Sequence, residues 1–228
     1  MNLIPLADWQ HAQVPTATAL TGRYIRLQAL KPALHGDQLW LVLQGPGADP
    51  QLWDYLPYGP FASRAVFDRW LSGCANGRDP LFFSLIEPSS GCAVGLLSLL
   101  NIVPADGCIE IGHVIFGAPL QRTPGASEAI YLLAQWAFEV LGYRRMEWKC
   151  NAANTRSRRA AERFGFTYEG LFRQHRVVKG HNRDTVWYSL LDHEWPACRS
   201  AFEHWLAADN FAGQGQQKQC LQDLRAQV

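Results

Sequence analysis

The sequence predicts an α/β protein of the α+β kind, in which helices pack against a mixed, mostly antiparallel sheet. Two observations lead to this prediction. In the first half, short apolar runs divided by turn residues are typical of hairpins, and in the second half capped helices alternate with strands. The order of hairpins, then strand, helix, strand, helix and two strands fits this class better than a doubly wound parallel sheet. A length of 228 residues suits one domain of moderate size.

The first half of the chain is predicted to contain a strand, two helices and a hairpin. Residues 24–30 alternate enough to form a strand, and residues 35–43 have the pattern of a short helix. A second helix follows an aromatic, turn-rich stretch and begins at the N-cap Ser63. The apolar runs 81–86 and 93–100 are separated by Glu-Pro-Ser-Ser-Gly, which predicts an antiparallel hairpin.

The second half begins with a strand over residues 108–116 and then the clearest helix of the chain. Thr123 is the N-cap candidate, Pro124 occupies the first helical position, where its missing N–H costs nothing, and Gly142 follows the last turn. Residues 145–150 alternate strictly between polar and apolar side chains. They therefore predict a strand with one buried face.

A further helix is predicted over residues 154–164, with Asn154 as N-cap and a glycine at its end. Strands follow near residues 166–172 and 185–191, and residues 197–208 have the pattern of an amphipathic helix.

The domain organisation expected from these patterns is simple. Residues 1–20 mix polar residues with Pro and Ala and are expected to form a loosely packed arm. Residues 21–195 form the main domain. Residues 196–228 hold the last helix and a Gln- and Gly-rich tail that is expected to be mobile.

Composition and charge argue against several classes of function. The formal net charge of +1 gives no electrostatic case for nucleic acid or an anionic membrane as a partner. No apolar run reaches the roughly 18 residues that a membrane span needs, and residues 1–15 lack the pattern of a secretory signal. The six cysteines are dispersed without the spacing of a zinc site. We therefore expect no metal and a reducing, cytoplasmic location.

The first candidate site lies where the predicted strand 108–116 leads into the helix that begins at Pro124. A helix N-terminus offers free N–H groups and partial positive charge, so it readily binds phosphate. The small residues Gly125, Ala126 and Ser127 allow an anion to approach the backbone, and Arg122 adds charge. A capped helix after a loop explains the same residues equally well.

The second candidate site is the start of the helix 154–164. Asn154 either caps the helix or bonds an amide-bearing ligand beside it, and Ser157 lies one turn further on. Without other information, a cap and a helix-start hydroxyl are the more frequent explanations. The arginines of this helix are more often a solvated face than a phosphate site.

Four elements of the sequence stand in the order and spacing of motifs from a known family. They are Glu110-Ile111-Gly112-His113, Gln121-x-x-Pro124-x-Ala126, Asn154-x-x-Ser157-x-Arg159-x-x-Glu162-x-Phe164-Gly165-Phe166, and Gly170 with Arg173 and the run Asn182-Arg183-Asp184-Thr185-Val186-Trp187-Tyr188-Ser189. Over residues 24–191 the chain resembles the GNAT superfamily of acetyltransferases. Within it, the chain is similar to the RimJ/RimL-like branch of ribosomal-protein N-terminal acetyltransferases.

The resemblance implies a sheet flanked by helices on both faces, with the strands 108–116 and 145–150 splayed into a cleft for the cosubstrate acetyl-CoA. Backbone groups of the first strand would pair with the pantetheine amides, and amides of the following loop would hold the pyrophosphate. The residues expected to bind the coenzyme are Val114, Ile115, Phe116, Gln121, Arg122, Thr123, Gly125, Ala126, Ser127, Asn154 and Arg159.

The chain departs from the family pattern in two places. Pro124 stands where the family usually has Gly, which removes one amide donor and predicts altered coenzyme contacts. Ala161 stands where many members carry a Tyr that acts as general acid. In the RimJ/RimL-like branch, Ser at the position of Ser157 is the usual candidate for that role.

The implied reaction is direct attack of a neutral amine on the acetyl thioester, which needs a base and a donor to the leaving thiolate. Glu110 is the first candidate base, directly or through water, and His113 is the second. Strand alternation places these two side chains on opposite faces. A structural carboxylate and a packed histidine are the alternative interpretations. Ser157 is the candidate donor to the thiolate.

The acceptor amine is left open between a protein N-terminus and a small molecule, and a homodimer is left open as well. Candidate acceptor contacts lie before the second helix and in the late hairpin, at Trp53, Tyr55, Tyr58, Arg173, His175 and Arg176. Two other classes of function also remain at this level. One is a non-catalytic acyl-CoA-binding sensor or regulator, and the other is a structural interaction domain with a decayed site.

Overall fold

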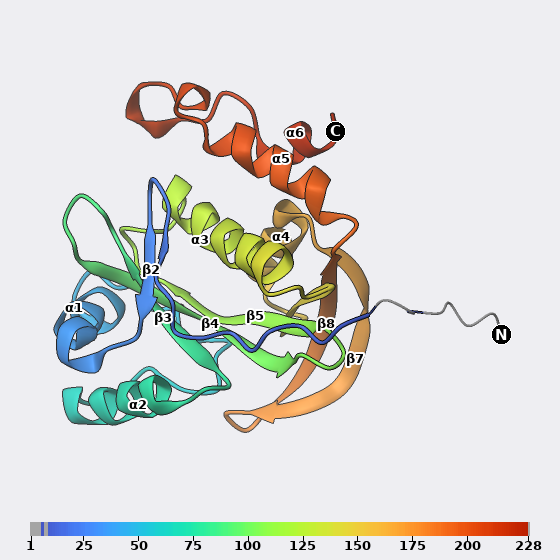
Figure 1. Cartoon of the computed structure of the whole chain (residues 1–228). Helices are drawn as coiled ribbons and strands as arrows, with labels where there is room; N and C mark the ends of the chain where they lie inside the picture. Colours follow the sequence, from blue (N-terminus) through green and yellow to red (C-terminus); the bar gives the residue numbers. More distant parts are fainter. Residues whose placement is uncertain (1–5, 7–8, 228) are drawn as a thin grey trace.

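A sheet of eight strands forms the centre of the protein in the computed structural model, which describes residue 6 and residues 9–227 (Figure 1). The strand order across the sheet is β1-β2-β3-β4-β5-β6-β8-β7. The strands are β1 (Leu20–Thr21), β2 (Arg26–Ala29), β3 (Leu81–Ile86), β4 (Ala93–Val103), β5 (Cys108–Phe116), β6 (Arg145–Asn151), β7 (Thr167–Val178) and β8 (His181–Leu191).

Helices cover both faces of this sheet, as Figure 1 shows. One face, called the α2 face below, carries α1 (Pro32–Gln44) and α2 (Arg64–Asn76). The opposite face, called the α3 face, carries α3 (Pro124–Gln135), the π-helical turn η1 (Trp136–Val140), α4 (Thr155–Phe164), α5 (Trp195–Leu206) and α6 (Leu221–Arg225). Short 3₁₀ turns η2 (Ala208–Asn210) and η3 (Gly213–Gly215) link α5 to α6. The mixed, mostly antiparallel sheet with helices on both faces confirms the predicted fold class.

The pair β5–β6 is parallel, and it parts after three residue pairs. Register runs from Cys108↔Arg145 to Glu110↔Glu147 and stops there. Beyond this point β6 continues to pair with β8 as far as Asn151↔Thr185. The C-terminal half of β5 therefore has β4 as its strand neighbour in the described part of the chain, and its other edge is open. This divergence agrees with the splayed strands that the sequence resemblance implied.

A β-bulge in β5 accompanies the divergence. Ser98 pairs with Gly112 and Leu96 pairs with Ile115, so His113 and Val114 together oppose Leu97. His113 adopts φ 49°, in the left-handed region. A bulge inserts one extra residue and reverses which face the later side chains point to. Accordingly, Ile115 packs in the core of the α2 face, whereas the earlier isoleucines of β5 pack in the core of the α3 face.

The predicted helix boundaries agree closely with the structure because they rest on local capping chemistry. Ser63 Oγ accepts from the Val66 amide at 3.4 Å, and Asn154 Oδ1 accepts from the Ser157 amide at 3.0 Å. Gly165 ends α4 in the left-handed region at φ 99°. Thr123 stands at the predicted N-cap of α3, but its hydroxyl donates to the Leu120 carbonyl instead of accepting from the helix.

The alternation of β6 is also confirmed. Met146, Trp148 and Cys150 are buried in the core of the α3 face. The charged residues between them, including Glu147 and Lys149, point to the α2 face. On β8, Val186, Tyr188 and Leu190 join the α3-face core, so the residues between them face the α2 side as well.

Both terminal segments differ from the sequence expectations. Within the expected arm, which lies in part outside the described residues, Ala12 is buried and Trp9 Nε1 donates to the Ala105 carbonyl at 3.0 Å. In the expected mobile tail, Leu221 and Leu224 are buried as part of α6. Two apolar residues three positions apart are too weak a pattern to predict a helix, and their burial depends on the surface that α4 and α5 present.

The last two strands are longer than predicted, because polar residues on their exposed faces mask the alternation. In the described part of the chain, no helix combines the length and apolar character of a membrane span.

We predict that Glu128→Gln destabilises the fold by about 1–3 kcal/mol, measured by urea unfolding. The buried Glu128 carboxylate accepts from the amides of Arg23, Tyr24 and Ile25 at 2.9, 2.6 and 2.8 Å, which fixes the turn between β1 and β2 to α3. A neutral amide accepts more weakly and leaves at least one amide without a partner. Asp209→Asn, the same charge change at an exposed position, is the control. Equal effects of the two substitutions would contradict the prediction.

Candidate active site

The centre of the candidate site is Glu110, at the last residue pair before β5 and β6 part. Its side chain is 7% exposed and accepts from Lys149 Nζ at 2.8 Å and from Asn101 Nδ2 at 2.6 Å. Lys149 Nζ also lies 2.6 Å from Glu147. Burial raises the pKa of Glu110, and the Lys149 charge and the two hydrogen bonds act in the opposite direction. Glu110 is thus a carboxylate in an ion-pair network and a better proton acceptor than an exposed one.

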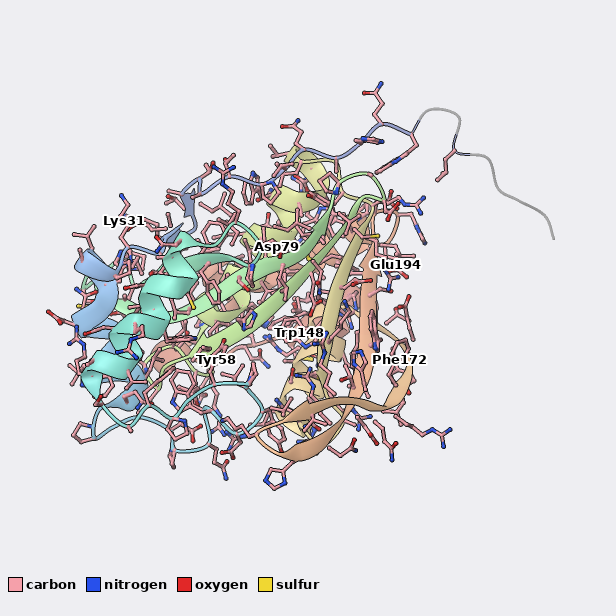
Figure 2. The ribbon with its side chains drawn as sticks, turned by 90° about the horizontal axis from the view of Figure 1, so that it is seen from below. Lys31, Tyr58, Asp79, Trp148, Phe172 and Glu194 are labelled. Carbon is pink, nitrogen blue, oxygen red and sulfur yellow. The ribbon has the colours of Figure 1, made fainter. Side chains whose placement is uncertain are left out.

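His113 lies close by and is held by an aromatic wall. Its Nδ1 is 2.6 Å from Tyr58 Oη, and the two rings stack at 5.7 Å (Tyr58 is labelled in Figure 2). The ring of Phe82, a residue of β3, has its centre 5.1 Å from the centre of the His113 ring. Burial, together with the charge of Arg183, lowers the pKa of His113 to about 4. The imidazole is therefore neutral at physiological pH, and its protonated form is disfavoured.

The expectation that Glu110 and His113 point to opposite faces is wrong. Ile109 and Ile111 pack in the α3-face core, so Glu110 points to the α2 face. His113 also contacts Phe82, which belongs to the α2-face core. The bulge explains the error, because the extra residue and the positive φ of His113 reverse the side-chain alternation.

The open edge of β5 carries the three residues expected to bond the pantetheine arm. The Gly117 amide donates to the Val94 carbonyl at 3.0 Å, so the antiparallel ladder directs the backbone groups of Ile115 toward β4. Those of Val114 and Phe116 point to the open edge. The Phe116 carbonyl already accepts from Gln121 Nε2 at 2.9 Å. The edge thus offers the groups of Val114 and the amide of Phe116 to a ligand.

The loop before α3 uses some of its expected donors internally. The Gln121 amide donates to the Gly117 carbonyl and the Thr123 amide to the Leu120 carbonyl. The amides of Gly125 and Ala126 belong to the first helical turn, where no intrahelical acceptor exists. These two are the best-placed anion donors.

Two further loop residues have local structural roles. A Cβ on Gly125 would lie 3.0 Å from the Tyr24 carbonyl oxygen, so only glycine fits easily. The Ser127 hydroxyl accepts from Arg163 Nη1 at 2.8 Å, which connects α3 to α4. Ser127 therefore contributes to helix packing in addition to any coenzyme contact.

At α4, the capping interpretation of Asn154 is confirmed, and the ligand-binding interpretation stays a prediction. Asn154 Oδ1 is the helix cap, which leaves its side-chain nitrogen for a ligand. Ser157 Oγ accepts from Trp148 Nε1 at 3.0 Å, so its hydroxyl hydrogen remains to be donated. Arg159 is exposed on the helix surface. Ala161, which stands where many family members carry a tyrosine, is fully buried. Its side chain therefore packs in the core and offers no hydroxyl to the site.

The loop between α1 and α2 reaches across to the far side of the parted strands. Arg156 on α4 binds Asp49 at 3.1 Å and Gln51 at 2.8 Å. Tyr55 Oη donates to the Ala153 carbonyl at 3.2 Å, just before α4. Lys179, in the turn between β7 and β8, donates to the Trp53 carbonyl at 2.7 Å.

The expected acceptor contacts therefore divide. Tyr55 and Tyr58 lie beside the parted strands. Trp53 is 2% exposed and is mainly a core residue, packed against Tyr58 and its aromatic neighbours. Arg173 and Arg176 are exposed on β7, and His175 packs near Trp187.

Sequence reasoning missed several residues that the structure brings to this site. Lys149 and Asn101 bond Glu110, and Arg183, Thr185 and Trp187 line the neighbouring strand β8 on the α2 face. The alternation of residues 145–150 was a usable signal for Lys149, since it placed that side chain on the polar face. The other contacts depend on strand register, which the sequence does not specify.

The geometry and the comparisons with known proteins agree on the class of protein. The chain matches the family described as the acetyltransferase (GNAT) domain over residues 27–167. The crystal structure of a GCN5-related N-acetyltransferase from Brucella melitensis superimposes with a TM-score of 0.94 at 47% identity, covering 97% of this chain and 100% of that one. A probable GNAT-family acetyltransferase from Chromobacterium violaceum gives a TM-score of 0.79 at 41% identity, with 86% and 97% coverage.

Sequence relatives point the same way. N-acetyltransferase p20 of Bacillus licheniformis, itself uncharacterized, is 29% identical over 156 residues, 65% of this chain and 84% of that protein. YdaF of Bacillus subtilis, provisionally named a ribosomal N-acetyltransferase, is 34% identical over 105 residues, 46% of this chain and 57% of YdaF. A mixed sheet that opens beside a helix N-terminus is thus the fold of an acyltransferase. This chain belongs to the GNAT acetyltransferase family.

We predict that the stability of the protein falls between pH 6.5 and pH 4 partly because of His113. The folded pKa of about 4 lies below the unfolded value near 6.5, so in this window the unfolded chain binds a proton that the folded chain does not. The contribution is complete above pH 6.5, is lost as the pH falls to 4, and amounts to at most about 3 kcal/mol.

The contribution of His113 to the free energy of unfolding is measured by urea unfolding of the wild type and of His113→Asn at about pH 6.5 and about pH 4. Asn is chosen because it tolerates positive φ. The variant should lose less stability on acidification than the wild type. His193→Asn, at an exposed position, should behave like the wild type. Parallel pH profiles for wild type and His113→Asn would disprove the prediction.

Proposed function

We propose that the protein is an acetyl-CoA-dependent N-acetyltransferase that acts on a primary amine by direct attack, the amine belonging to a protein N-terminus or to a small molecule. The parting of β5 from β6 beside the N-terminus of α3 is the observation that best supports this proposal. A fold neighbour, the microcin C7 self-immunity acetyltransferase MccE, was crystallised with acetyl-CoA and AMP. At 20% identity and a TM-score of 0.64, that likeness concerns the fold.

The residues present fit the coenzyme. The open backbone groups of Val114 and Phe116 suit the amides of an extended arm, which would add to the edge of β5 like a strand. The amides of Gly125 and Ala126 suit a pyrophosphate, Arg122 lies two residues before the helix, and the exposed Arg159 of α4 is proposed to add charge. When bound, acetyl-CoA supplies the acetyl thioester. Pro124 fits this arrangement because the two amides that follow it remain available.

Glu110 is the proposed base, acting directly or through water. It stands at the point of parting, and its raised pKa increases its affinity for a proton. Asn101 and Lys149 fix the carboxylate, which restricts its orientation. His113, held by Tyr58, is neutral and is the second candidate for accepting or relaying a proton.

Ser157 is the proposed donor to the leaving thiolate. Its hydroxyl accepts from Trp148, a residue of β6 just beyond the point of parting, and this bond orients the remaining hydrogen. Ala161 leaves no tyrosine at the alternative position. A role of Ser157 agrees with the RimJ/RimL-like branch, to which the resemblance to YdaF also points.

We predict that acetyl-CoA stabilises the protein and that Glu110→Gln abolishes most of its turnover. At 100 times its dissociation constant, a ligand stabilises the fold by about 2.7 kcal/mol, which thermal unfolding detects. Loss of a general base should lower kcat by about 10²- to 10⁴-fold. Release of the coenzyme thiol with a panel of amines measures turnover.

Glu147→Gln is the matched control, because Glu147 also binds Lys149 but is not the proposed base. The kcat of Glu147→Gln should stay within a few fold of the wild-type value. Binding of acetyl-CoA without transfer to any amine would instead support a non-catalytic sensor. The absence of any thermal shift would contradict coenzyme binding altogether.

We predict that Ser157→Ala lowers kcat about 10-fold or more with little change in the dissociation constant of acetyl-CoA. Stopped-flow single turnover separates the chemical step from binding. The substitution also leaves Trp148 Nε1 without its acceptor, so Ser157→Thr, which keeps a hydroxyl, serves as control. Full turnover by Ser157→Ala with unchanged affinity would rule out the proposed role.

A further inference from the structure

Three alternate residues of β8 form a polar stripe next to the candidate active site: Arg183, Thr185 and Trp187. They point to the α2 face, because the residues between and after them, Val186 and Tyr188, pack in the α3-face core. Trp187 pairs with Lys149, and Lys149 Nζ lies 4.1 Å from the centre of the Trp187 ring. The stripe thus begins beside the partner of Glu110 and runs outward along β8.

The face on which the stripe lies is not covered by a helix of the described chain. Figure 2 looks onto the α2 face, where α1 and α2 cover one half of the sheet and leave β6 and β8 free of helices. The β7–β8 hairpin curves below this open half in Figure 1. Phe172 of β7, labelled in Figure 2, packs against Trp187 with ring centres 4.7 Å apart.

Every residue of the stripe has a buried polar atom without a hydrogen-bond partner among the described residues. These atoms are Arg183 Nε, Thr185 Oγ1 and Trp187 Nε1. Thr185 is 1% exposed, so it cannot turn its hydroxyl to bulk water without moving. An unsatisfied buried polar group costs about 1–3 kcal/mol, and such groups are rare in folded proteins. Three such unsatisfied polar atoms lie on successive residues of one strand face, next to the pair of Glu110 and Lys149. This arrangement indicates a binding site for a ligand.

The charge of the stripe is positive and uncompensated. In the part of the chain that the structure describes, no carboxylate lies within ion-pair distance of Arg183, and its cross-strand partner is another cation, Arg176. Burial lowers the pKa of Arg183. Glu110, which is near enough to favour the charge of Arg183, is already bonded to Lys149. A partly buried cation without a partner is costly, which favours an anion as the ligand.

The coenzyme is a poor candidate for this anion. Its proposed phosphate site lies at the N-terminus of α3, on the opposite face of the sheet, whereas the stripe faces the α2 side. Arg183 shares the α2 face with His113 and contributes to the lowered pKa of that histidine, and its stripe begins at Trp187 beside Lys149, the partner of Glu110. The ligand is therefore expected to be the acceptor.

We propose that Arg183, Thr185 and Trp187 bind an anionic group of the acceptor, so that the preferred substrate is an amine that also carries a carboxylate. This inference rests on the proposed function. The planar guanidinium matches a carboxylate in two parallel hydrogen bonds, and the hydroxyl and indole N–H add further donors. Phosphate has related chemistry, and the experiment below separates the two.

The test compares acceptors that differ in one group. Glycine, β-alanine, γ-aminobutyrate and phenylalanine are assayed against their amides, and 2-aminoethyl phosphate against ethanolamine, with kcat/KM corrected to the neutral amine. The wild type should prefer at least one carboxylate over its amide by about 10- to 100-fold, the range expected for hydrogen bonds to a charged group. A preference confined to the phosphate compound would replace carboxylate by phosphate and overturn the proposal as stated.

Two substitutions assign the preference to the stripe. Arg183→Met should lower kcat/KM for the carboxylate acceptor about 10- to 100-fold and leave the KM of acetyl-CoA and the rate with the amide within about threefold. Arg78→Met removes an exposed cation on the loop between α2 and β3 and should change each value less than threefold. If Arg183→Met instead raised the KM of acetyl-CoA and kept the carboxylate preference, Arg183 would belong to the coenzyme site and the proposal would be wrong.

A binding measurement keeps the inference separate from the proposed function. Calorimetry with the same amines, in the presence of saturating coenzyme A, needs no turnover. Binding of a carboxylate amine that Arg183→Met abolishes would support the stripe even if no acetyl transfer occurred. Equal binding of acids and amides, or no binding of any acid by the wild type, would overturn it.

Discussion

The separation of β5 from β6 after Glu110 and Glu147 is the constraint on which the rest of the site depends. Two features of the chain maintain it. The bulge at His113 turns the end of β5 away and commits its inner edge to β4, and β6 pairs along its whole length with β8. Within the described residues, the main-chain groups at the open edge then have no strand partner, although unpaired edge groups are normally protected in folded proteins. An extended ligand that adds to this edge is the simplest way to satisfy them.

The same separation divides the site into two sides with different chemistry. On the α3 face, the first turn of α3 and the cap of α4 offer uncharged amides and side-chain nitrogen. On the α2 face, Glu110 and Lys149 form a buried ion pair, and Arg183 adds a cation that has no ion-pair partner among the described residues. The bulge brings His113 to this second side, so the candidate proton acceptors and the polar stripe of β8 share one environment. Their pKa values shift because of that environment, with burial as the largest cause for both Glu110 and His113.

Much of the fold could be predicted from the sequence because it depends on neighbours along the chain. Caps at Ser63 and Asn154 and the strict alternation of residues 145–150 were correctly interpreted, since each is a local hydrogen bond or a period of two. The proposed coenzyme loop and the proposed role of Ser157 rest on motif spacing and stay predictions. The sequence did not predict that Glu110 and His113 point to the same face of the sheet. A one-residue bulge cannot be recognised from the pattern of polar and apolar residues along the strand. The packing of α6 was missed because it depends on a surface formed by distant helices.

The sequence by itself determined the family, the order of elements and the residues at the helix starts, because capping and periodicity act over a few residues. Only the tertiary structure decided which groups meet. Asn101, Lys149 and Glu110 come from three strands, so their contacts depend on register, and the bulge decides that His113 faces the same side as Glu110. Register is fixed by the burial of whole faces, which is a property of the assembled sheet. For this reason the proposed coenzyme site could be outlined from the sequence, whereas the proposed acceptor site could be inferred only once the strands were paired.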